Sequence, residues 1–117
     1  MYGTQVRTFW SSTLYLGAIG KMMTPEHTKQ LLRNYRKLLA RYGANKLAPD
    51  SPSLTGGYYT TVQKLEHMAW MCEEALTFVD EKFDKAQRWL GFIQGILWAT
   101  NLKTISKMRD ESRSPEL

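Results

Sequence analysis

The chain has 117 residues, of which 43% are hydrophobic and 23% are charged, and its formal net charge is +5. This length normally makes one domain, and the composition is that of a globular chain rather than a disordered one. The single cysteine, Cys72, excludes an internal disulfide, and a lone cysteine beside six methionines favours a reducing, cytoplasmic compartment.

The positive charge is concentrated in two segments that flank an acidic one. Residues 21–46 contain seven basic residues and one acid, and residues 85–109 contain five basic residues and no acid. Between them, residues 64–84 contain six acids and two lysines. This pattern indicates either an anion-binding surface or complementary packing between copies of the chain.

Residues 1–21 differ in character from the rest of the chain, and we expect an N-terminal extension or arm. The run from Phe9 to Gly20 is moderately apolar, but it is too short to span a bilayer. Three interpretations are open: a secretory signal, an extension upstream of a start at Met22 or Met23, and an arm that packs on a neighbour. Three consecutive hydroxyl residues argue against the signal, and we favour the extension.

The first predicted helix follows Thr24 and ends near Gly43. Thr24 suits the N-cap, Pro25 the first turn, and Glu26 the positive end of the helix dipole, while Gly43 is a typical stop. Basic residues cover the remaining faces and indicate either a solvated or an anion-binding surface. The apolar stripe consists of Leu31, Leu32, Tyr35, Leu38, Leu39 and Tyr42.

A long loop and a second helix are predicted next. Residues 44–59 are rich in Pro, Gly, Ser and Asn, and this loop ends at Tyr58 and Tyr59. The helix predicted over residues 60–79 has two apolar stripes, which implies packing against two partners, and one of them can belong to another chain. The stripes are Val62, Leu65, Ala69, Cys72, Leu76 and Val79, and beside them Met68, Met71, Ala75 and Phe78.

The third predicted helix spans residues 80–101, with Asp80 as its N-cap. Gly91 and Gly95 interrupt it on one face, and each glycine costs about 1 kcal/mol relative to alanine. Either another helix packs closely there, or the glycines form a floor for a flat ligand. In the second case Arg88 binds phosphate, Trp98 stacks and Gln94 lies beside them. The expected core residues are Phe83, Ala86, Leu90, Ile93 and Leu97, and, taken singly, Trp70, Trp89, Phe92 and Trp98.

A short last helix is predicted after Thr104, through Ile105 and Met108, before a polar tail at residues 113–117. The fold class is therefore all-α: a small helical bundle of three main helices plus a short C-terminal helix. We expect a single domain over residues 22–112 that forms homo-oligomers through its second and third helices, with no membrane segment.

No residues form a recognisable catalytic or metal-binding pattern. Cys72 lies on an apolar seam and is expected to be a small buried hydrophobe. With His27, His67 and Cys72 as the available nitrogen and sulfur ligands, zinc is not expected. We therefore predict a protein that is not an enzyme and has no cofactor. A DNA-binding helix-turn-helix is disfavoured because the connection after the first helix is far longer than a tight turn.

Three segments carry a resemblance to a known family. TPEHTKQLLRNYRKL, LEHMAWMCEEALTFV and RWLGFIQGILW resemble small accessory proteins encoded by tailed bacteriophages. The resemblance covers roughly residues 22–110 and is loose over residues 43–60. It implies a phage origin and, by analogy with other small helical phage proteins, a role in modulating host antiviral defence; it implies no particular chemistry.

The functional expectation is a non-catalytic phage accessory protein that acts in the host cytoplasm by sequestering an anionic, nucleotide-like signalling ligand. A cyclic nucleotide or an ADP-ribose-type ligand fits the basic charge and the excess of aromatic residues. The alternatives are an inhibitor or adaptor that binds a host protein through the charged first helix and, third, a nucleic-acid-binding regulator. The predicted ligand-binding residues are Arg33, Arg36, Lys37, Tyr58, Tyr59, Lys85, Arg88, Gly91, Gln94, Gly95 and Trp98.

Overall fold

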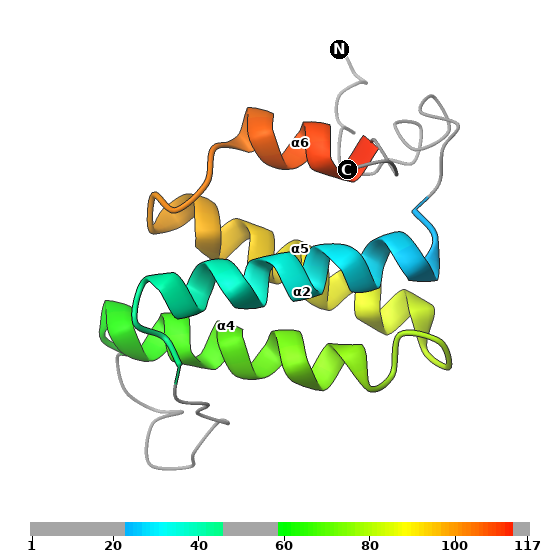
Figure 1. Ribbon diagram of the computed structural model, residues 1–117, viewed down its shortest axis with the longest axis horizontal. Helices are drawn as coiled ribbons and strands as arrows, with labels where there is room; N and C mark the ends of the chain where they lie inside the picture. The colour runs from blue at the N-terminus through cyan, green and yellow to red at the C-terminus, as the bar shows by residue number, and fades with distance from the viewer. Residues whose placement is uncertain (1–22, 46–58, 114–117) are drawn as a thin grey trace.

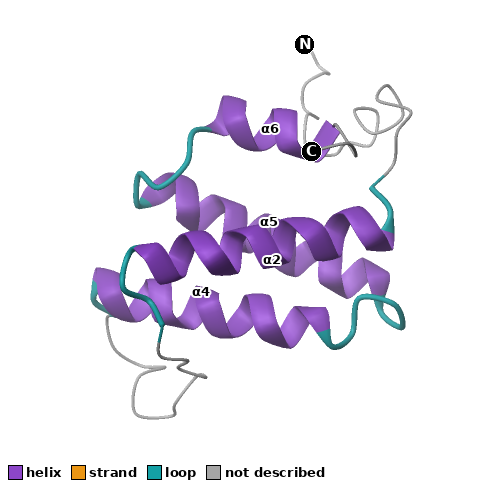
Figure 2. Cartoon of the chain, viewed as in Figure 1, coloured by secondary structure: helices purple, strands orange, loops and turns teal. Residues whose placement is uncertain are grey.

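The computed structural model describes residues 23–45 and 59–113, which form four α-helices and no strand. Consecutive helices run in opposite directions, and α6 lies on the other side of α2 from α4 (Figure 1). The all-α prediction is confirmed for this part of the chain (Figure 2). The predicted extension at residues 1–21, Tyr58 and most of the loop before it, and residues 114–117 lie outside the described residues. The helices are α2 (Pro25–Arg41), α4 (Thr61–Leu76), α5 (Phe83–Ala99) and α6 (Ile105–Arg113).

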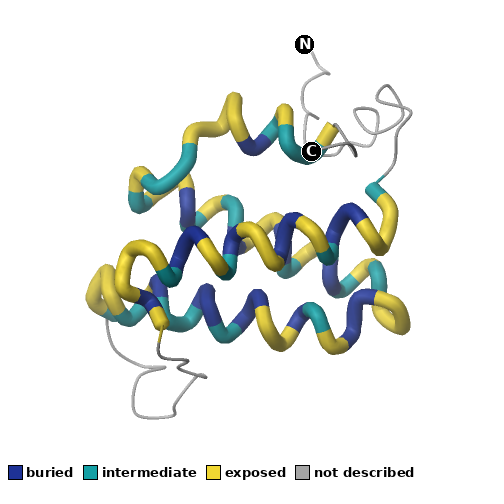
Figure 3. The backbone as a smooth tube through the Cα atoms, in the orientation of Figure 1, coloured by how far each residue is buried: buried dark blue, intermediate teal, exposed yellow. Residues whose placement is uncertain are grey.

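The core lies between α2, α4 and α5. Buried positions recur along these helices and alternate with exposed ones (Figure 3). α4 packs against both α2 and α5. The two partners that its apolar stripes require are therefore present in the same chain. The fully buried side chains include Leu32, Leu39, Ala69, Cys72, Ala75, Val79, Ala86, Ile93 and Leu97.

The predicted helix starts agree with the observed caps in three of the four helices. The Thr24 hydroxyl accepts a hydrogen bond from the His27 N–H (3.0 Å) at the start of α2. At α4, Thr60 and Gln63 form a reciprocal capping box. Thr104 accepts from the N–H of residue 107 (3.1 Å) at the start of α6. These caps satisfy backbone donors that a helix leaves unpaired at its N-terminus.

The predicted start of the third helix is wrong. α5 begins at Phe83, after Lys82, with no side-chain cap. Asp80 instead lies in the preceding turn, where its carboxylate is 2.8 Å from the ammonium of Lys29 on α2. The tertiary contact between Asp80 and Lys29 therefore occupies the side chain that local sequence suggested as a cap.

Four apolar residues expected inside are exposed. Tyr42 and Val62 are each 59% exposed, because they lie at the last and first turns of their helices, beyond the packed stretch. Phe92 and Trp98 are each 54% exposed on the side of α5 that points away from the core. The expectation that these two aromatic residues lie in the core is therefore wrong.

Candidate functional site

A pocket of about 440 Å³ lies where α2, the C-terminal end of α5 and the N-terminus of α6 meet. This volume falls within the range of pockets that hold small molecules. We call it the α6 pocket. Its walls are formed by Leu38, Trp98, Asn101, Leu102, Lys103, Thr104, Ile105 and Lys107.

The turn between α5 and α6 brings the walls of the α6 pocket together. Asn101 has a left-handed backbone conformation (φ 66°), which asparagine tolerates better than most residues. The N–H of Leu102 then donates to the carbonyl of Leu97 (2.9 Å), and the chain reverses direction. As a result, Trp98 before the turn and Lys107 after it line one pocket.

The charged groups lining the α6 pocket are both cations. Lys103 pairs with Glu111, whereas Lys107 has no acidic partner among the described residues. The first N–H groups of α6 also lie at this end, where a helix carries a partial positive charge. The pocket therefore combines an exposed aromatic wall with positive potential, and its lining contains no acid and no histidine.

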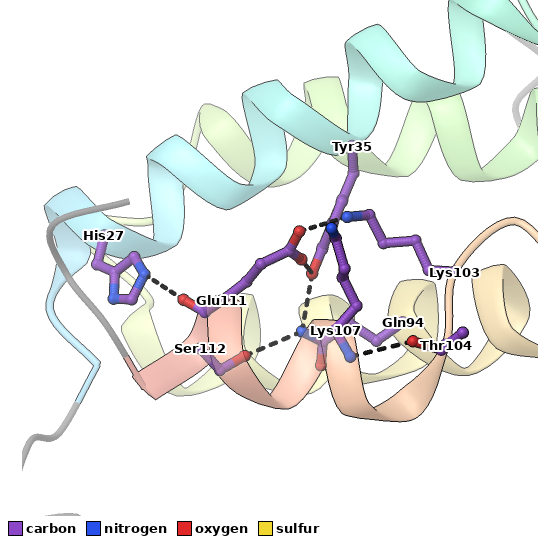
Figure 4. Close-up of polar contacts among 8 residues, drawn as sticks. All are labelled: His27, Tyr35, Gln94, Lys103, Thr104, Lys107, Glu111 and Ser112. Carbon is purple, nitrogen blue, oxygen red and sulfur yellow. Dashed lines mark hydrogen bonds and ion pairs between the residues drawn. The ribbon is translucent and has the colours of Figure 1, made fainter.

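Side-chain polar contacts centred on Glu111 hold α6 against α2 (Figure 4). The Glu111 carboxylate pairs with the Lys103 ammonium and accepts a hydrogen bond from the Tyr35 hydroxyl (3.2 Å). A ring nitrogen of His27 lies 2.8 Å from the Glu111 carbonyl oxygen. Met108 is the single buried side chain of α6, so polar contacts dominate its attachment.

Gln94 connects α5 to the same set of contacts. Its amide nitrogen donates to the Tyr35 hydroxyl (3.2 Å) and to the Ser112 hydroxyl (3.3 Å). Burial is the main cause that raises the pKa of Tyr35 well above its ordinary value, which keeps the hydroxyl protonated and able to donate. Gln94 therefore positions α6 in the described structure and is not part of the exposed face of α5.

The two glycines lie on that exposed face, together with Arg88 and Trp98. A Cβ atom placed on Gly91 or Gly95 would have no neighbour within 4 Å. No described helix therefore packs closely on the glycines. The exposed residues of α5, which we call its outward face, are Asp84, Arg88, Gly91, Phe92, Gly95, Trp98 and Ala99.

The predicted cations of α2 have different surroundings. The Arg36 guanidinium bonds to Glu73 on α4 (2.7 Å) and to the backbone carbonyls of residues 44–45 (3.3 and 3.2 Å). Arg36 therefore joins the C-terminal end of α2 to α4, and each nitrogen of its guanidinium group donates one of these three hydrogen bonds. Arg33 and Lys37 are exposed to solvent on the outer side of α2.

Tyr59 and Lys85 belong to a separate aromatic cluster between α4 and α5. The Lys85 ammonium is 4.7 Å from the ring centroid of Phe78 and 5.4 Å from that of Trp89. Tyr59 contacts the edge of the His67 ring, with centroids 6.2 Å apart. The structure thus separates these two residues from the α6 pocket.

Sequence analysis did not single out Lys103 and Lys107. The available signal was the run of five basic residues without an acid over residues 85–109. It also did not identify Glu111, because no local pattern distinguishes this acid from the neighbouring Asp110 or indicates a contact with Tyr35, 76 residues away.

Cys72 is fully buried, as predicted, and burial is the main cause that raises its pKa from 9.0 to about 12. Its thiol is therefore a poor nucleophile at neutral pH. We expect its contribution to the free energy of unfolding to be complete below about pH 9 and to be lost as the pH rises toward about 12. Urea denaturation at about pH 8 and about pH 10 should show this loss in the wild type. The Cys72→Ala variant should show a smaller pH dependence, and equal slopes for the two proteins would contradict the assignment.

No protein-family model, curated protein or solved structure matches the chain. Among the described residues, no three His, Cys, Asp or Glu side chains are grouped so as to hold a metal ion. None of the described helices has the length and hydrophobicity that a membrane-spanning segment requires.

Proposed function

We propose that this chain is a non-catalytic binding protein that holds an anionic, nucleotide-like ligand in the α6 pocket. The observation that carries the proposal is that Trp98 and Lys107 line the same pocket, at the N-terminus of α6. The sequence predicted the aromatic half of this site at Trp98. In this proposal, Lys107 and the first turn of α6 bind the phosphate group, whereas the sequence analysis assigned that role to Arg88.

The chemistry of the pocket suits both halves of a nucleotide. The Trp98 indole offers a flat surface on which a base can stack, and Leu38 and Leu102 supply apolar walls. The Lys107 ammonium and the N–H groups of residues 105–106, which the Thr104 cap does not engage, are suitable donors for phosphate oxygens. A ligand with a ring at one end and a phosphate at the other could contact the Trp98 indole and the Lys107 ammonium at the same time.

The residues that line the α6 pocket support a role in binding without catalysis. Proton transfer at neutral pH needs a positioned carboxylate or histidine, or another group with a suitably shifted pKa. The residues of the α6 pocket include no acid and no histidine. We therefore propose sequestration, with a role against host antiviral defence in the cytoplasm inferred from the resemblance to phage accessory proteins.

Ligand binding should depend on Trp98 and Lys107. In a thermal-shift screen of cyclic di- and trinucleotides, cyclic ADP-ribose isomers, NAD and short DNA, we expect one nucleotide to raise the Tm by several degrees. Trp98→Ala should raise the dissociation constant of that nucleotide by roughly 5- to 150-fold, because base stacking is worth about 1–3 kcal/mol. Lys107→Ala should lower the affinity for ligands that carry phosphate.

Arg33→Ala is the matched control, because Arg33 is an exposed cation outside the pocket. Its ligand affinity should equal that of the wild type. A nucleotide shift that Trp98→Ala leaves unchanged would refute the pocket assignment. A shift with DNA alone that disappears at high salt would favour the nucleic-acid alternative. No shift, together with a specific host protein in pull-downs, would favour the inhibitor or adaptor alternative.

A further inference from the structure

Three cations form a row along the exposed side of α2. This helix packs against α4, α5 and α6, which leaves one of its sides open to solvent. Arg33, Lys37 and Arg41 lie on that side at intervals of four residues, about 6 Å along the helix axis. None of the three forms an ion pair with a described residue. We call these three residues the α2 row.

The position of the α2 row is not explained by the stability of the helix. Residues four apart on a helix are neighbours, so like charges at this spacing repel each other and reduce stability. The helix dipole favours a cation in the last turn, which accounts for Arg41 but not for Arg33 and Lys37. The other cations of α2, Lys29 and Arg36, pair with acids of other segments. The α2 row is therefore the set of cations on this helix that remains available to a partner.

The acids around α2 do not neutralise the α2 row. Glu26 lies on the same side of the helix, two turns before Arg33, and is 3.5 Å from the ammonium of a lysine in its own turn. On α4, Glu73 pairs with Arg36, whereas Glu66, two turns earlier on the same side of α4, forms no ion pair with a described residue. Both acids of α6 are paired with cations. One unpaired acid beside three unpaired cations leaves this surface positive.

We propose that the α2 row binds the phosphate backbone of a nucleic-acid duplex, without regard to base sequence. Phosphates follow one another about every 3.4 Å along the axis of each strand, so each cation of the row can contact a separate phosphate. Such contacts supply affinity but carry no sequence information. Gln30 and Asn34, the side chains of this face that are suited to read base edges, are instead hydrogen-bonded to each other (3.3 Å).

The side chains of this face favour a nucleic acid over other polyanions. The exposed residues from position 30 to the end of α2 are all polar or charged: Gln30, Arg33, Asn34, Lys37 and Arg41. Protein interfaces usually centre on aromatic and apolar groups and are poor in lysine. A helix that lies on a membrane inserts apolar side chains into it. This face of α2 offers no apolar group for either kind of contact.

The test is the binding of the full-length protein to a short labelled DNA duplex of random sequence, followed by fluorescence anisotropy at several salt concentrations. Three phosphate contacts predict a slope of about −2.7 for log affinity against log salt, or a roughly 40-fold loss of affinity between about 50 and about 200 mM salt. The double variant Arg33→Ala/Lys37→Ala should reduce the slope to about −0.9 and lower the affinity at least about 10-fold at about 50 mM salt.

Lys64→Ala/Lys82→Ala is the matched control, because it removes the same charge from two exposed lysines that form no ion pair with a described residue. Its slope and affinity should stay close to those of the wild type. Equal losses in the two double variants would show that net charge sets the binding, and would overturn the proposal. So would a wild type that does not bind the duplex, or that binds poly-glutamate or anionic vesicles in its place.

Trp98→Ala separates this surface from the α6 pocket. It removes the aromatic wall of the pocket and leaves the α2 row intact, so duplex binding should be unchanged while nucleotide binding is weakened. Loss of duplex binding in Trp98→Ala would place the nucleic acid at the pocket and overturn the role of the α2 row. The two proposals can therefore fail independently of each other.

Discussion

Replacing Glu111 with alanine is expected to release α6 and to lower the free energy of unfolding by about 2–3 kcal/mol. The Glu111 carboxylate is the shared partner of the Lys103 ammonium and the Tyr35 hydroxyl, and its side chain is 20% exposed. Its removal leaves a partly buried cation and a buried hydroxyl without their acceptor. Because Met108 is the single buried side chain of α6, little apolar contact would hold the helix in place.

Hydrogen exchange can locate this effect. In Glu111→Ala the amides of α6 should exchange faster, while those of α2 and α4 keep their protection. Any ligand of the α6 pocket should also bind more weakly, because α6 carries the Lys107 wall. Asp110→Ala is the matched control, since Asp110 is exposed and its acidic group contacts Arg113 alone at 4.0 Å among the described residues. Unchanged protection of α6 in Glu111→Ala would contradict the role of Glu111.

Replacing Arg36 with alanine should lower the free energy of unfolding by about 2 kcal/mol and leave ligand affinity unchanged. The guanidinium makes charge-assisted hydrogen bonds to Glu73 and to the carbonyls of residues 44–45. These bonds connect α2, the chain after it and α4. Arg36→Lys should restore little of the loss, because a single ammonium does not reproduce the fork of donors.

Chemical denaturation and ligand titration on the same variants separate the two roles. Arg33→Ala, on the same helix but exposed, should change stability by less than about 0.5 kcal/mol. If Arg36→Ala retained full stability and lost ligand binding, the phosphate-binding role predicted for Arg36 from the sequence would be correct. The structural role described above would then be wrong.

The helices and most of the core could be predicted from the sequence because their signals are local. Thr24, Gly43 and Thr104 mark helix ends through hydrogen bonds and backbone conformations that involve residues a few positions away. The spacing of three and four likewise shows which side of each helix is apolar. Helix caps and apolar spacing can both be recognised from residues that lie within one or two helical turns of each other.

The candidate site could be predicted only in part, because its residues come from distant segments. Trp98 was recognised as an unusual aromatic residue, but its place beside Lys107 depends on the reversal of the chain at Asn101. Arg36 and Gln94 had the right chemistry for a ligand, yet each is engaged by protein groups that local spacing does not reveal.

The sequence by itself determined that the described part of the chain is all-α and which helical faces are apolar, since periodicity and capping act over short distances. The tertiary structure decided which polar side chains are engaged with other helices and which aromatic residues stay exposed. The physical reason is that a buried network or an open pocket depends on which surfaces meet. Which surfaces meet is decided by contacts between distant parts of the chain, such as the one between Tyr35 and Glu111, which are 76 residues apart.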